Sequence, residues 1–335
     1  MKAFEYARAG NLHQAIAAQG TGNAAVIAGG TEILNWMRLG IAEPDRLVDL
    51  AGLEGFDRIV QEGDHLRVGA LATLNAVGEH PLVVQHARAL AQASLAAASA
   101  QVRNRATLGG NVLQKTRCAY FRAEAPLPWG CNKRKPGSGC AARHGINERH
   151  AIFGWTEDCV AVQPSDPAVA LACLDAELEV TGPEGARAIR MTEFYLTQEE
   201  AAEQGDGAGH ETRLKPGEVI ASYRIPLGAK AGSAYIKVRE RESYEYALVS
   251  AAASIEMVEQ CIAAARVALG SVAQRPWRLP QAEHALIGQG LEADQLAPII
   301  ERAMADARPL DHNAYKVAMA RNAAVRAILA AGGRS

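Results

Sequence analysis

Four of the six cysteines in this 335-residue chain fall in one stretch rich in glycine, proline and basic residues. They are Cys118, Cys131, Cys140 and Cys159, with the spacing Cys-x12-Cys-x8-Cys-x18-Cys. The letters "CAYFRAEAPLPWGCNKRKPGSGC" do not read as part of a hydrophobic core. Thiolates are soft metal ligands, so the stretch indicates a metal or redox site.

The spacing leaves three interpretations of these cysteines open. Structural zinc sites usually contain short Cys-x2–4-Cys pairs, which this stretch lacks. Four thiolates supplied by a flexible loop suit an iron–sulfur cluster, whose ligands converge from several directions. Cysteines without a metal are the third interpretation. Disulfides are disfavoured, because the first 20 residues lack a secretory apolar segment and cytosolic thiols stay reduced.

Charge supplies a second argument for a cluster. Between Lys115 and Arg149 there are eight Lys or Arg residues and two Glu residues. Cations would stabilise the net negative charge of four thiolates around an oxidised four-iron core. The alternative is that they form a solvated face, or a surface on which another protein docks.

The other cysteines and the histidines of the stretch predict less. Cys173 and Cys261 lie in apolar segments, so we expect both in the core. His144 and His150 could be metal ligands, but the simpler expectation is solvated loop histidines.

Two Gly-Gly turns form the second informative pattern. In "VIAGGTEIL", residues 26–34, a short strand ends in glycines and Thr31 is expected to cap the next helix. Backbone N–H groups at such a turn suit a pyrophosphate, although the pattern is not the G-x-G-x-x-G fingerprint. "RNRATLGGNV", residues 103–112, contains a second Gly-Gly turn, this time after a threonine. Two turns ahead of a candidate redox centre favour a redox dinucleotide, and ordinary strand–turn–helix connections are the alternative.

Several function classes are disfavoured. A formal net charge of −2 gives no general attraction to nucleic acid, and no apolar run is long enough to cross a bilayer. The chain contains no G-x-S-x-G elbow, H-E-x-x-H motif or Walker loop.

The elements that must position these residues alternate between helix and strand. Residues 113–155 lose regular periodicity, residues 197–217 read as a polar surface loop, and a domain boundary is expected near 225–232. Apolar spacing predicts helices over 11–20, 31–40, 81–100 and the start of 166–182, and in the tracts 292–309 and 313–333. It predicts strands over 24–30, 46–50, 65–74, the end of 166–182, 219–227 and 233–240.

Together these segments resemble the FAD-binding subunit of molybdenum hydroxylases, the xanthine dehydrogenase and aldehyde oxidoreductase family. "AGGTEIL" looks like the first flavin loop of that family and "TLGGN" like the second. "PSDPAVALACLDAELEV" and "AYIKVRERESYEYALVSAAA" resemble its later segments. The cysteine-bearing insertion after "TLGGN" resembles the subgroup that carries an additional 4Fe-4S cluster, and its wording is similar to bacterial heterotrimeric aldehyde oxidoreductases.

The resemblance implies a role for particular residues. Cys118, Cys131, Cys140 and Cys159 would hold the cluster. Asp166 and Lys237 match positions near the flavin, where a cation would favour the anionic reduced ring. The remaining predicted FAD-binding residues come from the two loops: Val26, Ile27, Ala28, Gly29, Gly30, Thr31, Glu32, Ile33 and Leu34 from the first, and Thr107, Gly110 and Asn111 from the second.

The resemblance also implies an α+β fold in two parts. Residues 1–226 would form an FAD-binding domain of the vanillyl-alcohol-oxidase (PCMH) type, with subdomains of about 1–55 and 56–226 and the iron–sulfur insertion at about 113–160. Residues 230–335 would form a smaller α+β domain of the CO dehydrogenase flavoprotein type.

The function implied is electron transfer. The chain would pass electrons from 2Fe-2S clusters of a small subunit to FAD and on to an acceptor, while a large subunit oxidises an aldehyde at a molybdenum cofactor. A flavin subunit of the 4-hydroxybenzoyl-CoA reductase or xanthine dehydrogenase type is the alternative, and a zinc-stabilised interaction module with degenerate flavin loops is a third. We expect a cytoplasmic protein, or a periplasmic one exported with a signal-bearing partner.

Overall fold

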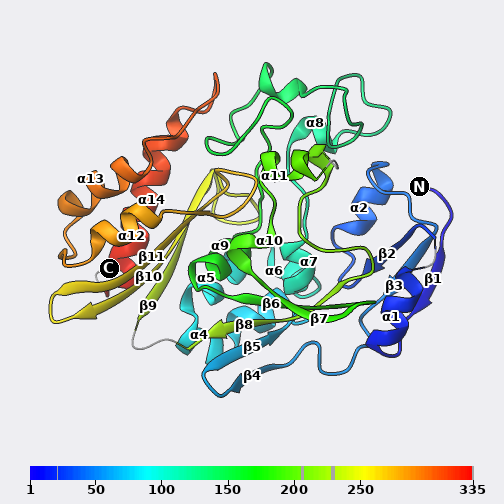
Figure 1. Cartoon of the computed structure of the whole chain (residues 1–335), viewed down its shortest axis with the longest axis horizontal. Coiled ribbons are helices and arrows are strands. Elements are labelled where there is room, and N and C mark those ends of the chain that lie inside the picture. Colours follow the sequence, from blue (N-terminus) through cyan, green and yellow to red (C-terminus); the bar gives the residue numbers. More distant parts are fainter. Residues whose placement is uncertain (21, 205–206, 228–230, 334–335) are drawn as a thin grey trace.

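A computed structural model describes residues 1–20, 22–204, 207–227 and 231–333. Within these residues the strands form three separate sheets, of three, five and four strands. Figure 1 shows the three-stranded sheet at the N-terminal end and the four-stranded sheet with its helices at the other end. The cysteine-bearing stretch runs along the top of that view.

The N-terminal sheet is parallel, with strand order β1-β3-β2, and its two helices cover opposite faces. Side chains alternate across β3: Val48 packs with Ala15 on one side, and Leu47 packs with Met37 on the other. The elements are β1 (Glu5–Arg8), α1 (Leu12–Gln19), β2 (Ala24–Ile27), α2 (Ile33–Arg38) and β3 (Arg46–Asp49).

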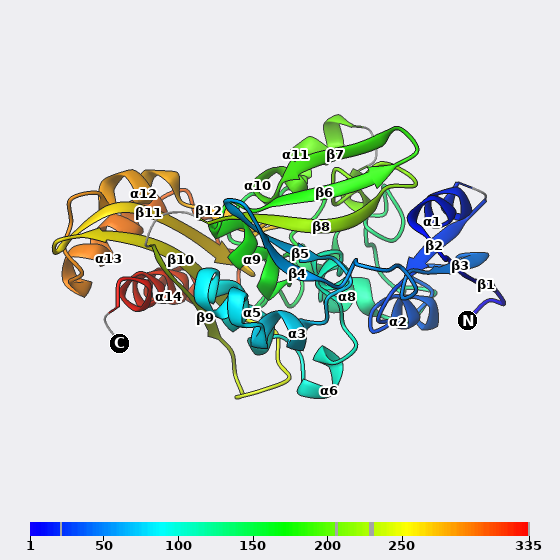
Figure 2. The same ribbon diagram turned by 90° about the horizontal axis from the view of Figure 1, so that it is seen from below.

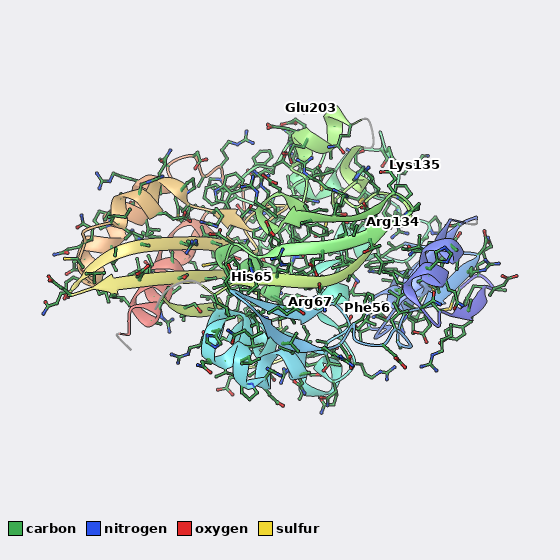
Figure 3. The ribbon with its side chains drawn as sticks, turned by 60° about the horizontal axis from the view of Figure 1, so that its bottom comes forward. Phe56, His65, Arg67, Arg134, Lys135 and Glu203 are labelled. Carbon is green, nitrogen blue, oxygen red and sulfur yellow. The ribbon has the colours of Figure 1, made fainter. Side chains whose placement is uncertain are left out.

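The five-stranded sheet is antiparallel, with strand order β4-β5-β8-β6-β7. One face is apolar, and the other carries charged side chains such as Arg67, whose Nε donates to Glu179 Oε2 at 3.2 Å (Figure 3). The strands are β4 (Ile59–Glu62), β5 (His65–Gly69), β6 (Glu177–Gly182), β7 (Gly185–Arg190) and β8 (Val219–Pro226). Leu66, Val68, Leu178 and Tyr223 are fully buried on the apolar face. Alternation of period two therefore fixes which face meets the core.

Short helices fill the space beneath this apolar face. Residues 81–100, predicted as one helix, form two, because the backbone leaves helical geometry at Ala87 with φ of −139°. The helices of this part of the chain are α3 (Leu74–Glu79), α4 (Pro81–His86), α5 (Arg88–Ala96), α6 (Ala100–Arg103), α7 (Leu108–Val112), α8 (Ala119–Arg122), α9 (Asp166–Cys173), α10 (Met191–Phe194) and α11 (Gln198–Glu203).

The C-terminal sheet is antiparallel, with strand order β12-β11-β10-β9, and lies between α14 on one face and α5 and α9 on the other (Figure 2). Small residues allow close packing: a Cβ on Gly232 would lie 2.1 Å from the carbonyl oxygen of Ala331 in α14. The elements are β9 (Gly232–Val238), β10 (Val249–Val258), β11 (Cys261–Gly270), β12 (Trp277–Arg278), α12 (Pro280–Leu286), α13 (Ala293–Ala303) and α14 (Tyr315–Ala331).

Several sequence predictions of local structure are wrong. Residues 197–217 are not a plain surface loop, because α11 lies there and Gln198 and Ala201 are buried. Cys261 is exposed at the start of β11, whereas Cys173 lies in the core as expected. Residues 113–155 do lack long elements: α8 and a single 3-10 turn at Ala141–Arg143 are the helical segments there.

Within the described residues, none of the helices combines the length and apolar character that crossing a bilayer requires.

Helix α9 gives a test of the packing. Leu171 is fully buried in the core shared by the central and C-terminal sheets. Leu171→Ala should lower the free energy of unfolding by about 3 kcal/mol, because it leaves a cavity that the neighbours cannot fill. Urea denaturation measures the change. Ile287→Ala, at a position 53% exposed, is the control and should change it by less than about 0.5 kcal/mol. Equal effects of the two substitutions would contradict the packing described.

Candidate functional site

The first glycine turn follows β2, and its backbone lies against the segment that enters the second turn. A Cβ on Gly29 would lie 1.8 Å from the carbonyl oxygen of Arg105, so only glycine permits this approach. Gly30 has φ of +75°, which glycine adopts without strain. Glu32, not Thr31, occupies the N-cap of α2, and no side-chain cap bond forms there. The predicted Thr31 cap is therefore wrong.

The second glycine turn is held by side chains on either side of it. Thr107 is the N-cap of α7, and its Oγ1 accepts from the backbone N–H of Gly110 at 3.2 Å. The N–H of Gly109 donates to the carbonyl of Ala70, beyond the end of β5, at 2.8 Å. Ser165, the N-cap of α9, donates to Asn111 Oδ1 at 2.7 Å. Strand β5 and helix α9 thus fix the turn.

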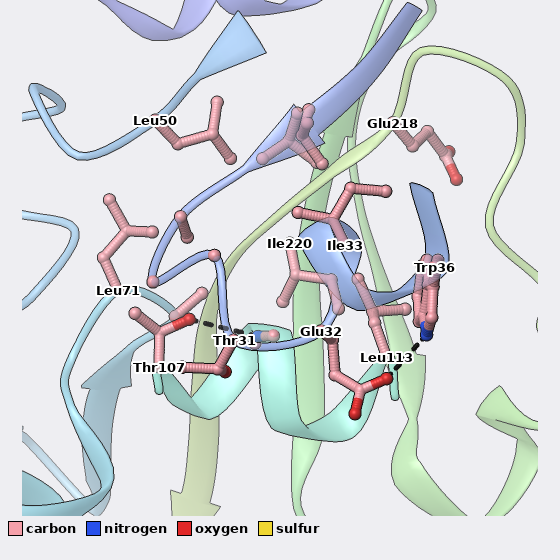
Figure 4. Close-up of a pocket in the computed structure, with 18 residues that line it drawn as sticks. Thr31, Glu32, Ile33, Trp36, Leu50, Leu71, Thr107, Leu113, Glu218 and Ile220 are labelled. Atoms are coloured by element: carbon pink, nitrogen blue, oxygen red, sulfur yellow. Dashed lines mark hydrogen bonds between the residues drawn. The ribbon is translucent and has the colours of Figure 1, made fainter. Parts of the chain in front are cut away.

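Three neighbouring cavities are lined by residues of the two turns. The central one, of about 150 Å³, is mostly apolar and is shown in Figure 4. A second, of about 390 Å³, opens toward Arg241 and Tyr246 of the C-terminal part. A third, of about 480 Å³, includes Arg58 and Arg105. Gly110 lines the first two, and Gly29 lines the first and third. We call the three together the turn groove; adjoining cavities with shared lining residues suit an extended ligand.

The turn groove gathers most of the predicted loop residues. Ile27 and Leu34 line none of its three cavities: Ile27 packs toward α2, and Leu34 is 43% exposed. The predicted residues that line the groove are Val26, Ala28, Gly29, Gly30, Thr31, Glu32, Ile33, Thr107, Gly110 and Asn111.

Asp166 and Lys237 lie together, behind the wall of the groove. Lys237 Nζ is 2.8 Å from Asp166 Oδ2, and both side chains are nearly fully buried. Tyr235 donates to the other carboxylate oxygen at 2.5 Å, and Lys237 also donates to the carbonyl of Ala96 at 3.0 Å. Neither charged residue lines a cavity of the turn groove. Lys237 is a buried partner of Asp166, so the alternative of a surface charge on a strand is wrong.

The four clustered cysteines approach one another. Cys131 and Cys140 pair across an isolated antiparallel bridge, and Cys118 packs in one small apolar cluster with Cys159. Burial raises the pKa of Cys118 to about 12 and that of Cys159 to about 11. Negative charge on Cys131 and Cys159 would raise that of Cys118 further, and charge on Cys140 acts in the same way on Cys131 and Cys159. All six cysteines are free thiols.

As the side chains stand, no group of three or more His, Cys, Asp or Glu residues in the described part of the chain could hold a metal ion. A single zinc ion needs its sulfurs in one tight tetrahedron, with Zn–S distances of about 2.3 Å. The zinc interpretation therefore gains no support. A four-iron cluster is wider, because its cysteines bind different corners of the core.

A buried cation lies beside the cysteines. Lys133 has a side chain only 2% exposed, and its Nζ lies 2.8 Å from Glu211 Oε1. Lys115 Nζ lies 2.8 Å from the other oxygen of the same carboxylate. Burial alone would raise the pKa of Glu211, but these two lysines outweigh it and hold the pKa at about 2. Burial likewise opposes the charge of Lys133, yet Glu211 and the thiols of Cys159 and Cys131 leave its pKa raised.

Glu32 joins the first glycine turn to the cysteine stretch. Its carboxylate pairs with Arg117 and, at 2.8 Å, with Arg122. It also accepts from Trp36 Nε1 at 2.6 Å. Arg122 donates in turn to the carbonyls of Thr116 and Lys115. Because Glu32 lines the turn groove, the groove and the cysteine stretch share one charged contact.

The end of the cysteine stretch is anchored by the end of the chain. Lys316, fully buried at the start of α14, donates to the carbonyls of His150 and Ser271 at 2.7 and 2.6 Å. Asn313 Nδ2 donates to the carbonyls of His150 and Ala151, both at 3.1 Å. These contacts hold His150 beside the cysteines.

His150 is not a solvated loop histidine, so that expectation is wrong. It is 7% exposed, and its Nε2 lies 3.2 Å from Cys118 Sγ. Burial, aided by the charge of Lys316, lowers its pKa to about 4, so the imidazole is neutral at neutral pH.

Sequence reasoning missed four residues that tie the site together: Arg117, Arg122, Lys133 and Glu211. The excess of cations between Lys115 and Arg149 was visible, but which carboxylate each would meet was not. Glu211 comes from the segment predicted as surface loop, and no local pattern marked it as buried.

Two family models together match most of the chain. A family model described as "FAD binding domain in molybdopterin dehydrogenase" matches residues 2–228, and one described as "CO dehydrogenase flavoprotein C-terminal domain" matches residues 233–331. The chain is 42% identical over 324 residues to the aldehyde oxidoreductase FAD-binding subunit PaoB of Escherichia coli, covering 96% of each chain.

More distant relatives match over nearly the whole length. The carbon monoxide dehydrogenase medium chain of Hydrogenophaga pseudoflava is 25% identical over 99% of this chain and 98% of its own. A solved structure of carbon monoxide dehydrogenase from that organism superposes with a TM-score of 0.76 at 25% identity, over 99% and 98% of the two chains. The expected α+β fold is thereby confirmed. The chain belongs to the FAD-binding medium subunits of the molybdenum hydroxylase family.

Proposed function

We propose that this chain is the FAD- and 4Fe-4S-containing electron-transfer subunit of a molybdenum-dependent aldehyde oxidoreductase. The observation that carries the proposal is the junction at Glu32, where a groove suited to a dinucleotide meets a stretch with four neighbouring thiols. The 42% identity to an aldehyde oxidoreductase subunit supports the substrate class.

The turn groove would hold FAD, which supplies a two-electron carrier able to take electrons one at a time. Backbone N–H groups of the two glycine turns would meet the pyrophosphate. The apolar central cavity excludes water from the part of the ligand that it covers.

We propose that Asp166 and Lys237 act from behind this groove. Asp166 follows Ser165, whose hydroxyl bonds Asn111 in the groove wall. A buried ion pair at this point holds the start of α9, and through Ser165 it fixes the second turn. The pair thereby orients the flavin side of the groove while leaving the cavity free.

The cysteine stretch would hold the 4Fe-4S cluster through Cys118, Cys131, Cys140 and Cys159. This assignment is supported by four free thiols that approach one another from four points of an irregular chain. Burial raises the pKa of Cys118 to about 12 and that of Cys159 to about 11, so these two thiols are neutral at pH 7 and would release protons when iron binds. Lys133 is placed to compensate the negative charge that results.

We propose that the chain works in a heterotrimer with a molybdenum-cofactor large subunit and a 2Fe-2S small subunit. In this arrangement residues 1–226 bind FAD, in subdomains of about 1–55 and 56–226, and residues 230–335 form the C-terminal domain. The complex would lie in the cytoplasm, or in the periplasm if a signal-bearing partner exports it.

Loss of the close turn contact should release FAD. In Gly29→Ala the new methyl would clash with the Arg105 carbonyl and part the two turns. We expect FAD affinity to fall at least about tenfold, equivalent to about 1.4 kcal/mol. Flavin fluorescence titration of the apoprotein measures it. Gly20→Ala is the matched control, because its methyl would meet nothing closer than 3.6 Å. Full FAD affinity in Gly29→Ala would contradict the groove assignment.

Serine replacements should separate ligand cysteines from the others. In the purified complex, Cys131→Ser and Cys140→Ser should each lose the iron of one cluster, because serine is a poor ligand for this core. Cys261→Ser, at an exposed position, should keep it. Iron per molybdenum, measured by mass spectrometry, reports the loss. Unchanged iron in both ligand variants would reject the cluster.

The subunit alone should be inactive toward aldehydes. We expect the FAD-loaded chain to oxidise no aldehyde with a dye acceptor, and the co-expressed heterotrimer to oxidise aldehydes with the same acceptor. Xanthine and 4-hydroxybenzoyl-CoA are the comparison substrates. Turnover of either of them in place of aldehydes would favour the corresponding alternative complex.

A further inference from the structure

A group of two lysines and one glutamate, of which Lys133 is almost fully buried, lies beside the four cysteines. Lys133 and Lys115 bind opposite oxygens of the Glu211 carboxylate, each at 2.8 Å. The Glu211 side chain is 16% exposed, and its pKa is lowered to about 2, so the carboxylate is negatively charged at neutral pH. We call these three residues the lysine triad. Two positive charges and one negative charge leave the triad with one excess positive charge.

The Lys133 end of the triad reaches the sulfur atoms. Lys133 follows Cys131 by two residues, and the backbone of Cys131 pairs with that of Cys140. Lys133 Nζ also donates to the carbonyl of Ala208 at 2.8 Å. Ala208 packs in the apolar cluster that contains Cys118 and Cys159. The ammonium group therefore lies beside both pairs of cysteines, the bridged pair Cys131 and Cys140 and the apolar pair Cys118 and Cys159.

This ammonium group cannot be screened as a surface lysine would be. Its side chain is 2% exposed, and the apolar side chains of Ala208, Cys118 and Cys159 lie beside it. Charges interact more strongly at low dielectric. Reduction adds one electron to an iron–sulfur centre that is already negative, so a fixed neighbouring cation stabilises the reduced form more than the oxidised form.

We infer that Lys133 sets the reduction potential of the four-cysteine centre, and that Glu211 limits how much of the lysine charge the centre experiences. Lys133 is thus a positioning and tuning residue, not a ligand. The inference rests on the proposed 4Fe-4S cluster and deepens it.

The test is whether substitutions of Lys133 and of Glu211 shift the midpoint potential of the centre in opposite directions. Lys133→Met removes a positive charge and should move the midpoint potential downward. Glu211→Gln removes a negative charge and should move it upward. The measurement is a dithionite titration of the intact complex followed by electron paramagnetic resonance. The signal of this centre is the one that disappears in Cys131→Ser.

Two further variants separate charge from structure. Lys133→Arg keeps the charge and should keep the wild-type potential. The double variant Lys133→Met with Glu211→Gln keeps one excess positive charge on Lys115 and should return close to it. A structural role alone would lower cluster content in every variant without shifts of opposite sign.

The outcomes are distinct. Absence of any signal that depends on Cys131 overturns the cluster and this inference together. A signal whose potential is unchanged in Lys133→Met and Glu211→Gln, or moves in the same direction in both, overturns the inference and leaves the cluster intact. If Lys133→Met fails to retain iron, the midpoint potentials of Glu211→Gln and Lys133→Arg decide the question. The inference then requires an upward shift of the potential in Glu211→Gln and no shift in Lys133→Arg.

Discussion

The site depends on the approach of two backbone segments in which no side chain takes part. Gly29 meets the carbonyl of Arg105 so closely that a single methyl group would separate them. This contact sets the two glycine turns side by side, and the groove forms along the two adjacent turns. Everything that lies further along the chain, from Thr107 to the helix after Ser165, is placed relative to this junction.

Charge pairs then connect parts of the chain that the backbone junction does not reach. Glu32 holds Arg117 and Arg122, and so fastens the start of the cysteine stretch to the groove. Glu211 holds Lys115 and Lys133, and so fastens the middle of the stretch to the segment after α11. Breaking one partner of a buried pair leaves an uncompensated charge, which costs more than an exposed pair is worth. A long irregular segment thereby acquires a fixed position without regular hydrogen bonding.

The sequence predicted the local parts of this arrangement. The glycine turns, the strand that enters the first of them and the two long C-terminal helices were readable from turn residues and apolar periodicity. The gathering of four cysteines was predicted from residue type and composition. What failed was tertiary: Ala87 divides a tract with unbroken helical spacing, and Glu32 takes the cap position expected of Thr31. Lys237 and Glu211 are buried because partners distant in sequence neutralise them, and no local pattern records such partners.

The anchoring of the cysteine stretch by the last helix has a consequence for biosynthesis. The carbonyls of His150 and Ala151 find their donors in Asn313 and Lys316, nearly half a chain later. While the ribosome is still making the C-terminal sheet, those carbonyls have only water, and the thiols beside them stay loosely placed. The pocket around His150 is therefore complete only once Asn313 and Lys316 have been synthesised, long after the cysteines themselves.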